Sequence, residues 1–279
     1  MTCVTLIVTP SPWPKSFFPF AGYTSAVGVH TSLLAFSALF LPRTTEIIEF
    51  LKPAIDPSQL TSRDRPQHPF LDALTMSPVS TLACICVGAA IWWIDFALEG
   101  SSIEKRIDKA LIDQRKNTTL GNAWLTTVAG SLIFHGVLVL FGAPITSHLW
   151  QTYLLALLLS ILTVFPPAYT LGSPLLAPKT EAIETRMTWI RLFAEFSVKT
   201  SVERAILYPA VGTILGCWLG AIPIALDWDR PWQAWPLTPT FGAVVGYILS
   251  SVVALMASAT RYLADENIRS MHAAKIKTS

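Results

Sequence analysis

The sequence predicts an all-α polytopic membrane protein with six transmembrane helices. Hydrophobic residues make up 52% of the 279-residue chain and charged residues only 14%, whereas an average soluble domain has roughly 25% charged residues. The apolar residues also come in long blocks, and about 20 consecutive apolar residues cross the hydrocarbon core of a bilayer as a helix. Both observations favour membrane-spanning helices over a water-soluble core.

Six apolar blocks are predicted as spans. In chain order they cover about residues 23–41, 77–98, 122–142, 149–165, 205–226 and 241–258. The first is the least apolar, because it contains His30 and several Ser and Thr residues. We therefore expect an N-terminal segment over 1–22, a six-helix domain over 23–258 and a C-terminal tail over 259–279. The N-terminal segment lacks a basic start and is interrupted by prolines, so we expect it to be retained rather than cleaved as a signal peptide.

The distribution of basic residues predicts the orientation. Six spans place both termini on one side, and that side carries about three times as many Lys and Arg residues as the other. The termini are therefore predicted to be cytosolic, and the connection between spans five and six to face the lumen or the exterior. The glycosylation sequon at Asn117 then lies in the cytosol, where we expect it to stay unmodified.

The connections between the predicted spans differ in character. Residues 42–76 are rich in proline and polar residues, which predicts a poorly ordered lumenal loop. Residues 180–202 carry apolar side chains at three- and four-residue steps, which predicts an amphipathic helix. That helix lies either on the cytosolic face of the membrane, with Trp189 and Phe193 at the headgroup level, or against the cytosolic loops. The pattern alone does not separate these two placements.

The sequence offers little support for catalysis. No nucleophile-elbow, zinc-protease, phosphate-loop or dinucleotide motif occurs in a suitable context. His30, Asp95 and His135 lie inside or near the ends of spans, where an ionisable group is a functional candidate because charge is costly there. A structural role is favoured for all three, since histidines can hydrogen-bond between helices and Asp95 can reach water. Five scattered histidines and four cysteines without a CxxC pattern predict neither a metal site nor a cofactor. The net charge of +2 predicts no nucleic-acid partner.

Glycines recur at four-residue steps in the last two predicted spans. They are Gly212, Gly216 and Gly220 in span five and Gly242 and Gly246 in span six. Residues four apart share one helix face, so these glycines predict smooth grooves for close helix packing. The two grooves are expected to pack on each other, although the third glycine of span five also leaves room for a helix of another protein.

The connection between spans five and six reads ALDWDRPWQAWP over residues 225–236 and is unusually dense in charged and aromatic groups. Its charged residues are Asp227, Asp229 and Arg230, and its aromatic residues are Trp228, Trp232 and Trp235. The charges could pair or bind a lipid phosphate, and the indole rings suit a membrane interface or the face of a sugar. Prolines restrict the backbone and stop the helix. An interfacial turn explains the position of this loop, but it does not explain the density of its specific groups.

The segment GCWLGAIPIALDWDRPWQAWPLTPTFGAVVGY, residues 216–247, resembles the PIG-F family of membrane proteins that assemble glycosylphosphatidylinositol (GPI) anchors in the endoplasmic reticulum. Upstream, the resemblance lies in the hydropathy layout. It implies a non-catalytic subunit that stabilises large phosphoethanolamine transferases of the PIG-O and PIG-G type, which modify mannoses of the GPI precursor on the lumenal side. It also implies contact of the loop with the transferase or with the GPI glycolipid, within surrounding membrane lipid. The loop residues in question are Asp227, Trp228, Asp229, Arg230, Trp232, Gln233 and Trp235.

The alternative is a small intramembrane transferase or glycolipid-handling enzyme. It would use Asp227, Asp229 and Arg230 on a phospholipid. The sequence favours the subunit, because no predicted lumenal domain is large enough to hold the two metal ions typical of phosphoryl-transfer sites. A flippase is disfavoured because His30 and His135 do not form a continuous polar path across the membrane.

Overall fold

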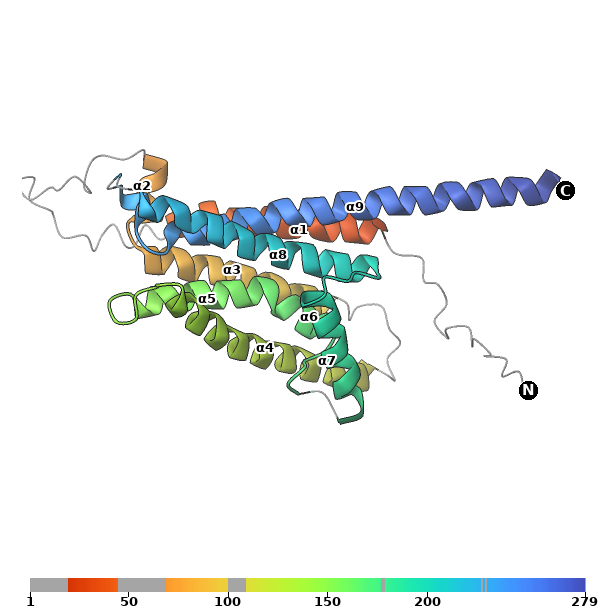
Figure 1. The fold of residues 1–279 in the computed structure, drawn as a ribbon, viewed down its shortest axis with the longest axis horizontal. Coiled ribbons are helices and arrows are strands. Elements are labelled where there is room, and N and C mark those ends of the chain that lie inside the picture. The colour runs from red at the N-terminus through yellow and green to blue at the C-terminus, as the bar shows by residue number, and fades with distance from the viewer. Residues whose placement is uncertain are drawn as a thin grey trace, which may run out of the picture.

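The structure is a computed structural model that describes residues 20–44, 69–99, 109–176, 179–226, 228 and 230–278. These residues form helices, turns and short connections, with no strand among them. The longest helices lie side by side along one axis (Figure 1). They are α1 (Phe20–Leu39), α3 (Pro78–Glu99), α4 (Lys109–Leu140), α5 (Leu149–Thr163), α8 (Ser201–Ala221) and α9 (Leu237–Thr278). The all-α prediction is confirmed for the described part of the chain.

Four of the described helical stretches are long and apolar enough to cross a membrane. They are Phe20–Arg43, Asn117–Leu140, Ser201–Ala225 and Leu237–Ile268. The apolar parts of α3 and α5 are shorter, at Pro78–Ile94 and Leu149–Thr163. α5 ends early because the next residues include Pro166 and Pro167, which have no backbone N–H to continue the helical ladder. The chain then continues after Val164 as α6 (Phe165–Thr170). The structure thus supports four of the six predicted spans by length and composition, and shorter apolar helices occupy the other two.

Within the described residues, five helices form a closed ring. α1 contacts α3, α3 contacts α5, α5 contacts α8, α8 contacts α9, and α9 contacts α1 again. α4 packs outside this ring against α5 and α6. The largest described group of buried apolar residues joins α1, α3, α5 and α9, and includes Leu34, Ile85, Leu158, Leu162 and Val244. The ring fixes the position of the α8–α9 connection relative to the first turn of α5.

The end of the bundle that holds the α8–α9 connection also holds two short helices, η1 (Leu41–Thr44) and α2 (Pro69–Thr75) (Figure 1). The guanidinium carbon of Arg43 lies 4.4 Å from the centre of the Phe70 ring, so η1 and α2 are joined by a cation–π contact. α2 also contacts η6 (Pro231–Gln233) in the α8–α9 connection. Part of the segment 42–76, predicted as a loop, is therefore helical, while residues 45–68 lie outside the described residues.

The opposite end of the bundle carries α7 (Lys179–Phe193), which lies across the ends of the longer helices (Figure 1). The helix predicted over 180–202 stops at Phe193 because the chain turns, with Phe196 in the left-handed region at φ 53°. A new helix, α8, then starts at Ser201 with Thr200 as its N-cap. The predicted amphipathic segment is thus one helix, a turn and the first residues of the next helix.

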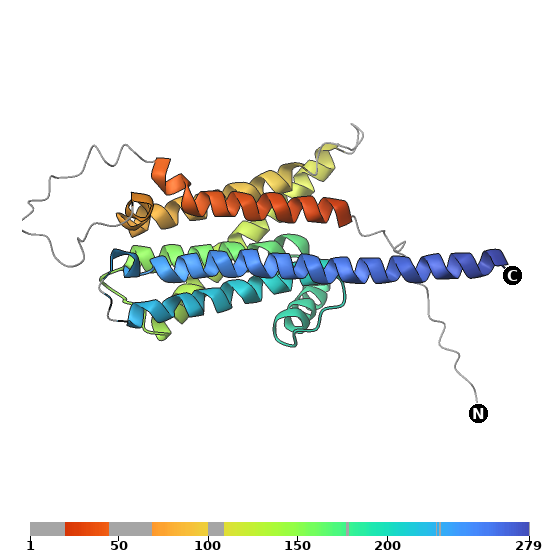
Figure 2. The same ribbon diagram turned by 90° about the horizontal axis from the view of Figure 1, so that it is seen from above.

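α9 continues well beyond the rest of the bundle. It contains 42 residues without a break, which corresponds to about 63 Å at 1.5 Å per residue. Its second half projects past the other helices in both views (Figures 1 and 2). Tyr262 stacks on Phe20 at the start of α1, with the two ring centres 5.3 Å apart. The predicted sixth span therefore occupies the first half of a much longer helix, and the predicted tail begins inside it.

Candidate functional site

The glycine faces of α8 and α9 lie directly against each other. A Cβ atom added at Gly216 would collide with the carbonyl oxygen of Gly242, and one added at Gly246 would collide with the carbonyl oxygen of Gly212. Gly220 faces the backbone at the start of α9 in the same way. Without side chains on these faces, the two backbones come into direct contact. The glycine groove is therefore occupied within the chain, and α8 and α9 form a close antiparallel hairpin that presents the connecting loop.

Gln233 closes this loop on itself. Its side-chain Nε2 donates to the carbonyl oxygen of Pro223 at 2.7 Å and to that of Leu226 at 2.6 Å. Its Oε1 accepts from the backbone N–H of Arg230 at 2.9 Å. Both amide hydrogens and the amide oxygen thus bind the loop backbone. We assign Gln233 to holding the shape of the loop, although the sequence alone placed it among the contact residues.

Trp235 ties the loop to the ring of helices. Its indole Nε1 donates to Thr152 Oγ1 at 3.0 Å, and Thr152 Oγ1 in turn donates to the carbonyl oxygen of His148 at 3.0 Å. Its ring packs against a buried cluster that includes Leu82 and Leu155. Trp235 therefore faces the protein, with its polar N–H satisfied at the first turn of α5.

The other two tryptophans contact each other, with Trp228 exposed and Trp232 half-buried. The ring centres of Trp228 and Trp232 lie 5.6 Å apart, and Trp228 is 54% exposed. Arg230 lies between them in sequence and is also exposed. Asp227 and Asp229 lie outside the described residues. The structure thus separates the predicted contact residues. Trp235 faces the protein and Gln233 bonds the loop backbone, whereas Trp228 and Arg230 are exposed beside the half-buried Trp232.

A cavity of about 510 Å³ lies beneath the loop. It is lined from the loop by Arg230 and Gln233, from α5 and its N-cap by Gln151 and His148, and from α3 by Pro78. Gln151 Oε1 is buried and has no hydrogen-bond partner among the described residues. The cavity therefore places the donor groups of Arg230 and His148 near the amide oxygen of Gln151. A headgroup that carries a phosphate or a hydroxyl group could bond to such groups.

The sequence did not reveal the contribution of α5. Gln151 and Thr152 lie in the first turn of α5 and His148 is its N-cap, far before the loop in sequence and without a recognisable motif. Of the ionisable candidates inside the spans, His30 and His135 do not line the cavity beneath the loop. His30 is buried in the helix ring, and the Nδ1 atom of His135 is buried without a hydrogen-bond partner among the described residues. The side chain of Asp95 lies outside the part of the chain whose side chains are described.

Replacing Gln233 with leucine should loosen the loop, because two carbonyl oxygens and one N–H would lose their partner together. Leaving such groups unsatisfied costs about 1–3 kcal/mol where they are shielded from water. We expect faster backbone hydrogen exchange across residues 226–236, measured by mass spectrometry on the purified chain. Gln151→Leu is the matched control, because no hydrogen bond to the loop depends on its amide oxygen. Equal exchange rates in the wild type and Gln233→Leu would contradict the assignment.

Comparison with known proteins identifies the family. The model of the GPI biosynthesis protein family Pig-F matches residues 67–255, which include α8, the loop and most of the apolar part of α9. This match covers more than half of the chain. The chain belongs to the PIG-F family.

Several curated relatives of this PIG-F family member carry names from GPI biosynthesis. A human protein named "GPI ethanolamine phosphate transferase, stabilizing subunit" is 38% identical over 120 residues, or 43% of this chain and 50% of the human protein. A Pyricularia oryzae protein named "Glycosylphosphatidylinositol anchor biosynthesis protein 11" is 43% identical over 48% of this chain and 44% of its own length. A Neurospora crassa protein of the same name is 32% identical over 65% of this chain and 66% of its own. The chain thus spans about half the length of the first two relatives and about two thirds of the third. No solved structure matches the chain.

Proposed function

We propose that this PIG-F family member is a non-catalytic accessory subunit of a GPI ethanolamine phosphate transferase. The observation that carries the proposal is the family match across the α8–α9 hairpin and its loop, together with the human relative's name as a stabilizing subunit. The hairpin supports this role physically, because a close glycine contact and the Gln233 bonds present one fixed surface. A fixed surface suits a partner that must be held in one geometry.

The proposed topology has six spans in the endoplasmic reticulum membrane, with both termini cytosolic. The excess of Lys and Arg on the terminal side supports this orientation. The start of α1 and the end of α9 lie toward the same end of the bundle (Figure 1). The exposed apolar side chains Ile183, Met187 and Ile190 on α7 suit the cytosolic membrane surface. The loop between α8 and α9 then faces the lumen, where the GPI mannoses are modified.

In this proposal the loop contacts either the transferase or the GPI glycolipid. Transferases of the PIG-O and PIG-G type are the proposed partners. Trp228 and Arg230 are exposed on the loop, and the half-buried Trp232 contacts Trp228. Such aromatic and arginine groups suit both a protein hot spot and a sugar phosphate. The proposed contact residues also include Asp227 and Asp229, on the basis of the sequence alone.

The first test is removal of the chain from cells that make it. The abundance of the partner transferase, measured by immunoblot, should fall several-fold and return when the wild-type chain is restored. Transfer of phosphoethanolamine should be absent when the purified chain is assayed without the transferase. Robust transfer by the chain alone would favour the alternative, an enzyme that uses Asp227, Asp229 and Arg230.

The second test separates the two roles of the loop. Trp232→Ala should leave the protein folded, because the half-buried ring belongs to none of the described buried clusters. If Trp232→Ala co-purifies with the transferase while GPI intermediates accumulate, the loop contacts the glycolipid. If the complex dissociates, the loop docks the transferase. Trp218→Ala is the matched control, because Trp218 is 60% exposed on α8 and lies outside the loop. Wild-type behaviour of Trp232→Ala in both assays would remove the loop from the proposal.

A further inference from the structure

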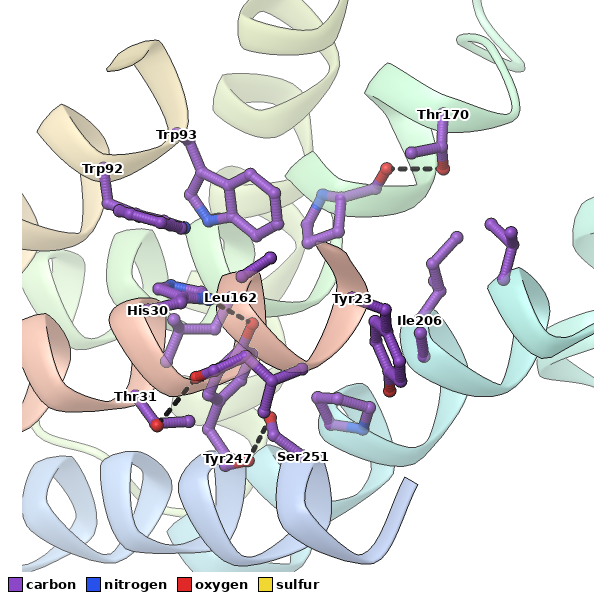
Figure 3. Close-up of a pocket in the computed structure, with 16 residues that line it drawn as sticks. Tyr23, His30, Thr31, Trp92, Trp93, Leu162, Thr170, Ile206, Tyr247 and Ser251 are labelled. Atoms are coloured by element: carbon purple, nitrogen blue, oxygen red, sulfur yellow. Dashed lines mark hydrogen bonds between the residues drawn. The ribbon is translucent and has the colours of Figure 1, made fainter. Parts of the chain in front are cut away.

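A second cavity, of about 170 Å³, lies inside the helix ring and is unrelated to the lumenal loop (Figure 3). His30, Trp92 and Trp93 lie at one end of it, and Tyr23, Thr170 and Ile206 lie at the other. Among the described residues, none that lines it is Asp, Glu, Lys or Arg. Because an isolated charge is costly in such surroundings, the cavity suits an uncharged occupant.

His30 is the polar centre of this cavity. It is only 6% exposed and stacks on Trp92, with the ring centres 5.0 Å apart. The edges of Trp93 and Tyr247 meet it at 5.1 Å each. Its Nδ1 lies 3.1 Å from the hydroxyl oxygen of Tyr247, whereas its Nε2 is buried and has no hydrogen-bond partner among the described residues.

The Tyr247 contact sets the position of the histidine proton. The buried phenol hydrogen needs an acceptor, and Nδ1 of His30 is within hydrogen-bond distance. A phenol that donates to Nδ1 leaves the neutral imidazole with its hydrogen on Nε2. We assign this tautomer, in which the unsatisfied group at this end of the cavity is an N–H donor.

The Thr and Ser hydroxyl groups along the cavity are bonded within their own helices. Thr31, Thr170 and Ser251 each donate to the carbonyl oxygen four residues earlier, at 2.8, 2.8 and 2.7 Å (Figure 3). None of these three hydroxyl groups is hydrogen-bonded to Nε2 of His30. A buried donor without a partner is uncommon in proteins and indicates that something else accepts its hydrogen. A lone water fits poorly, because a buried water normally makes two to four hydrogen bonds.

We propose that this cavity binds the oxygen-bearing part of an uncharged lipid. A carbonyl or hydroxyl oxygen of the lipid accepts the Nε2 hydrogen of His30, and the aromatic rings pack on the adjoining carbon atoms. The cavity volume of about 170 Å³ is close to that of an engineered apolar cavity of about 150 Å³ that binds benzene. Only the polar group and its nearest carbons therefore enter, and the rest of the lipid lies along the outside of the helices. Both a diacylglycerol ester and a sterol hydroxyl have this chemistry.

His30 lies near the middle of α1, about 15 Å from its first residue at 1.5 Å per residue. The cavity extends from there toward Tyr23, close to the end at which α1 begins. An occupant therefore enters from the leaflet on that side. This site is separate from the lumenal loop, so the inference does not depend on the proposed subunit function.

The test uses the full chain in phosphatidylcholine nanodiscs to which dioleoylglycerol or ergosterol is added in steps. We expect one of these lipids to raise the midpoint of thermal unfolding of the wild type to a plateau, and which one does so identifies the source of the oxygen. His30→Gln should respond in the same way, because its amide N–H reaches the position of Nε2. His30→Phe keeps the stacking but loses the donor, and should bind roughly fivefold more weakly or worse.

A cavity-filling variant keeps the test decisive if His30→Phe does not fold. Ala205→Leu on α8 adds bulk at the cavity wall and leaves His30 and Tyr247 unchanged. It should abolish the lipid-dependent rise in the unfolding midpoint. No saturable response of the wild type to either lipid would overturn the inference. An equal response in the wild type, His30→Phe and Ala205→Leu would overturn it as well.

Discussion

Replacing Gly216 with leucine should prevent α8 and α9 from forming their hairpin. The position of its Cβ atom is already filled by the backbone of Gly242, so the two helices would have to separate along their whole contact. Overpacking of a core by side chains alone costs about 1–3 kcal/mol, and a clash with backbone leaves fewer ways to relax. We expect a destabilisation above about 3 kcal/mol and loss of the monodisperse protein on size-exclusion chromatography.

Gly136→Leu on α4 provides the matched control. A Cβ at Gly136 meets no atom within 4 Å, so the same substitution enters open space. That variant should elute and unfold like the wild type. Gly216→Ala should be intermediate, because its single added carbon meets the same carbonyl oxygen. A Gly216→Leu protein as stable as the wild type would show that α8 and α9 do not pack as described.

The second large effect is expected at the junction of α7 and α8, where one carboxylate joins the two helices. Glu203 accepts two hydrogen bonds from the Arg191 guanidinium, at 2.5 and 3.2 Å. It also accepts from the backbone N–H of Lys199 at 2.7 Å and of Thr200 at 3.3 Å, which completes a capping box. Glu203→Ala removes all four bonds. Loss of the cap alone costs about 1 kcal/mol, and the freed α7 should expose the connecting turn.

Trypsin cleavage after Lys199 measures this exposure, because Lys199 lies in the connecting turn. We expect cleavage of Glu203→Ala to be roughly tenfold faster than that of the wild type, corresponding to a loss of about 1.4 kcal/mol in local stability. Glu203→Gln, which keeps an acceptor oxygen but loses the charge, should be intermediate. Glu184→Ala removes an exposed acid from α7 and should cleave at the wild-type rate. Equal rates in Glu203→Ala and Glu184→Ala would rule out the junction as a stabilising contact.

The helical architecture was predictable because apolar blocks have a simple physical cause. A stretch that must remain in hydrocarbon is continuously apolar, and the predicted starts of the third and sixth spans fall inside α4 and α9. The full extents of these helices were not predictable in that way. α4 starts at Lys109 and α9 runs to Thr278, where polar residues continue the helix without any hydropathy signal. The turn at Phe196 was missed because a left-handed conformation at phenylalanine has no sequence marker.

The candidate site was only partly predictable. Four-residue glycine spacing indicated a close helix contact, because the requirement for small residues is local to one helix face. The sequence placed Trp235 and Gln233 beside Trp228 and Trp232 as equivalent contact groups. The structure gives them different roles, because the contact of Trp235 with Thr152 joins residues 83 positions apart. Such a pairing depends on how the ring of helices closes, which the order of residues in the loop does not reveal.

The unbroken length of α9 links the two ends of the molecule mechanically. Its first residue follows directly on Trp235 and Pro236 in the loop, and its last described residue is Thr278. A straight rod of about 63 Å that tilts by about 5° around the loop end moves its far end by about 5 Å. A tilt of α9 at the loop is therefore accompanied by a larger displacement of its opposite end, which extends beyond the bundle (Figure 1).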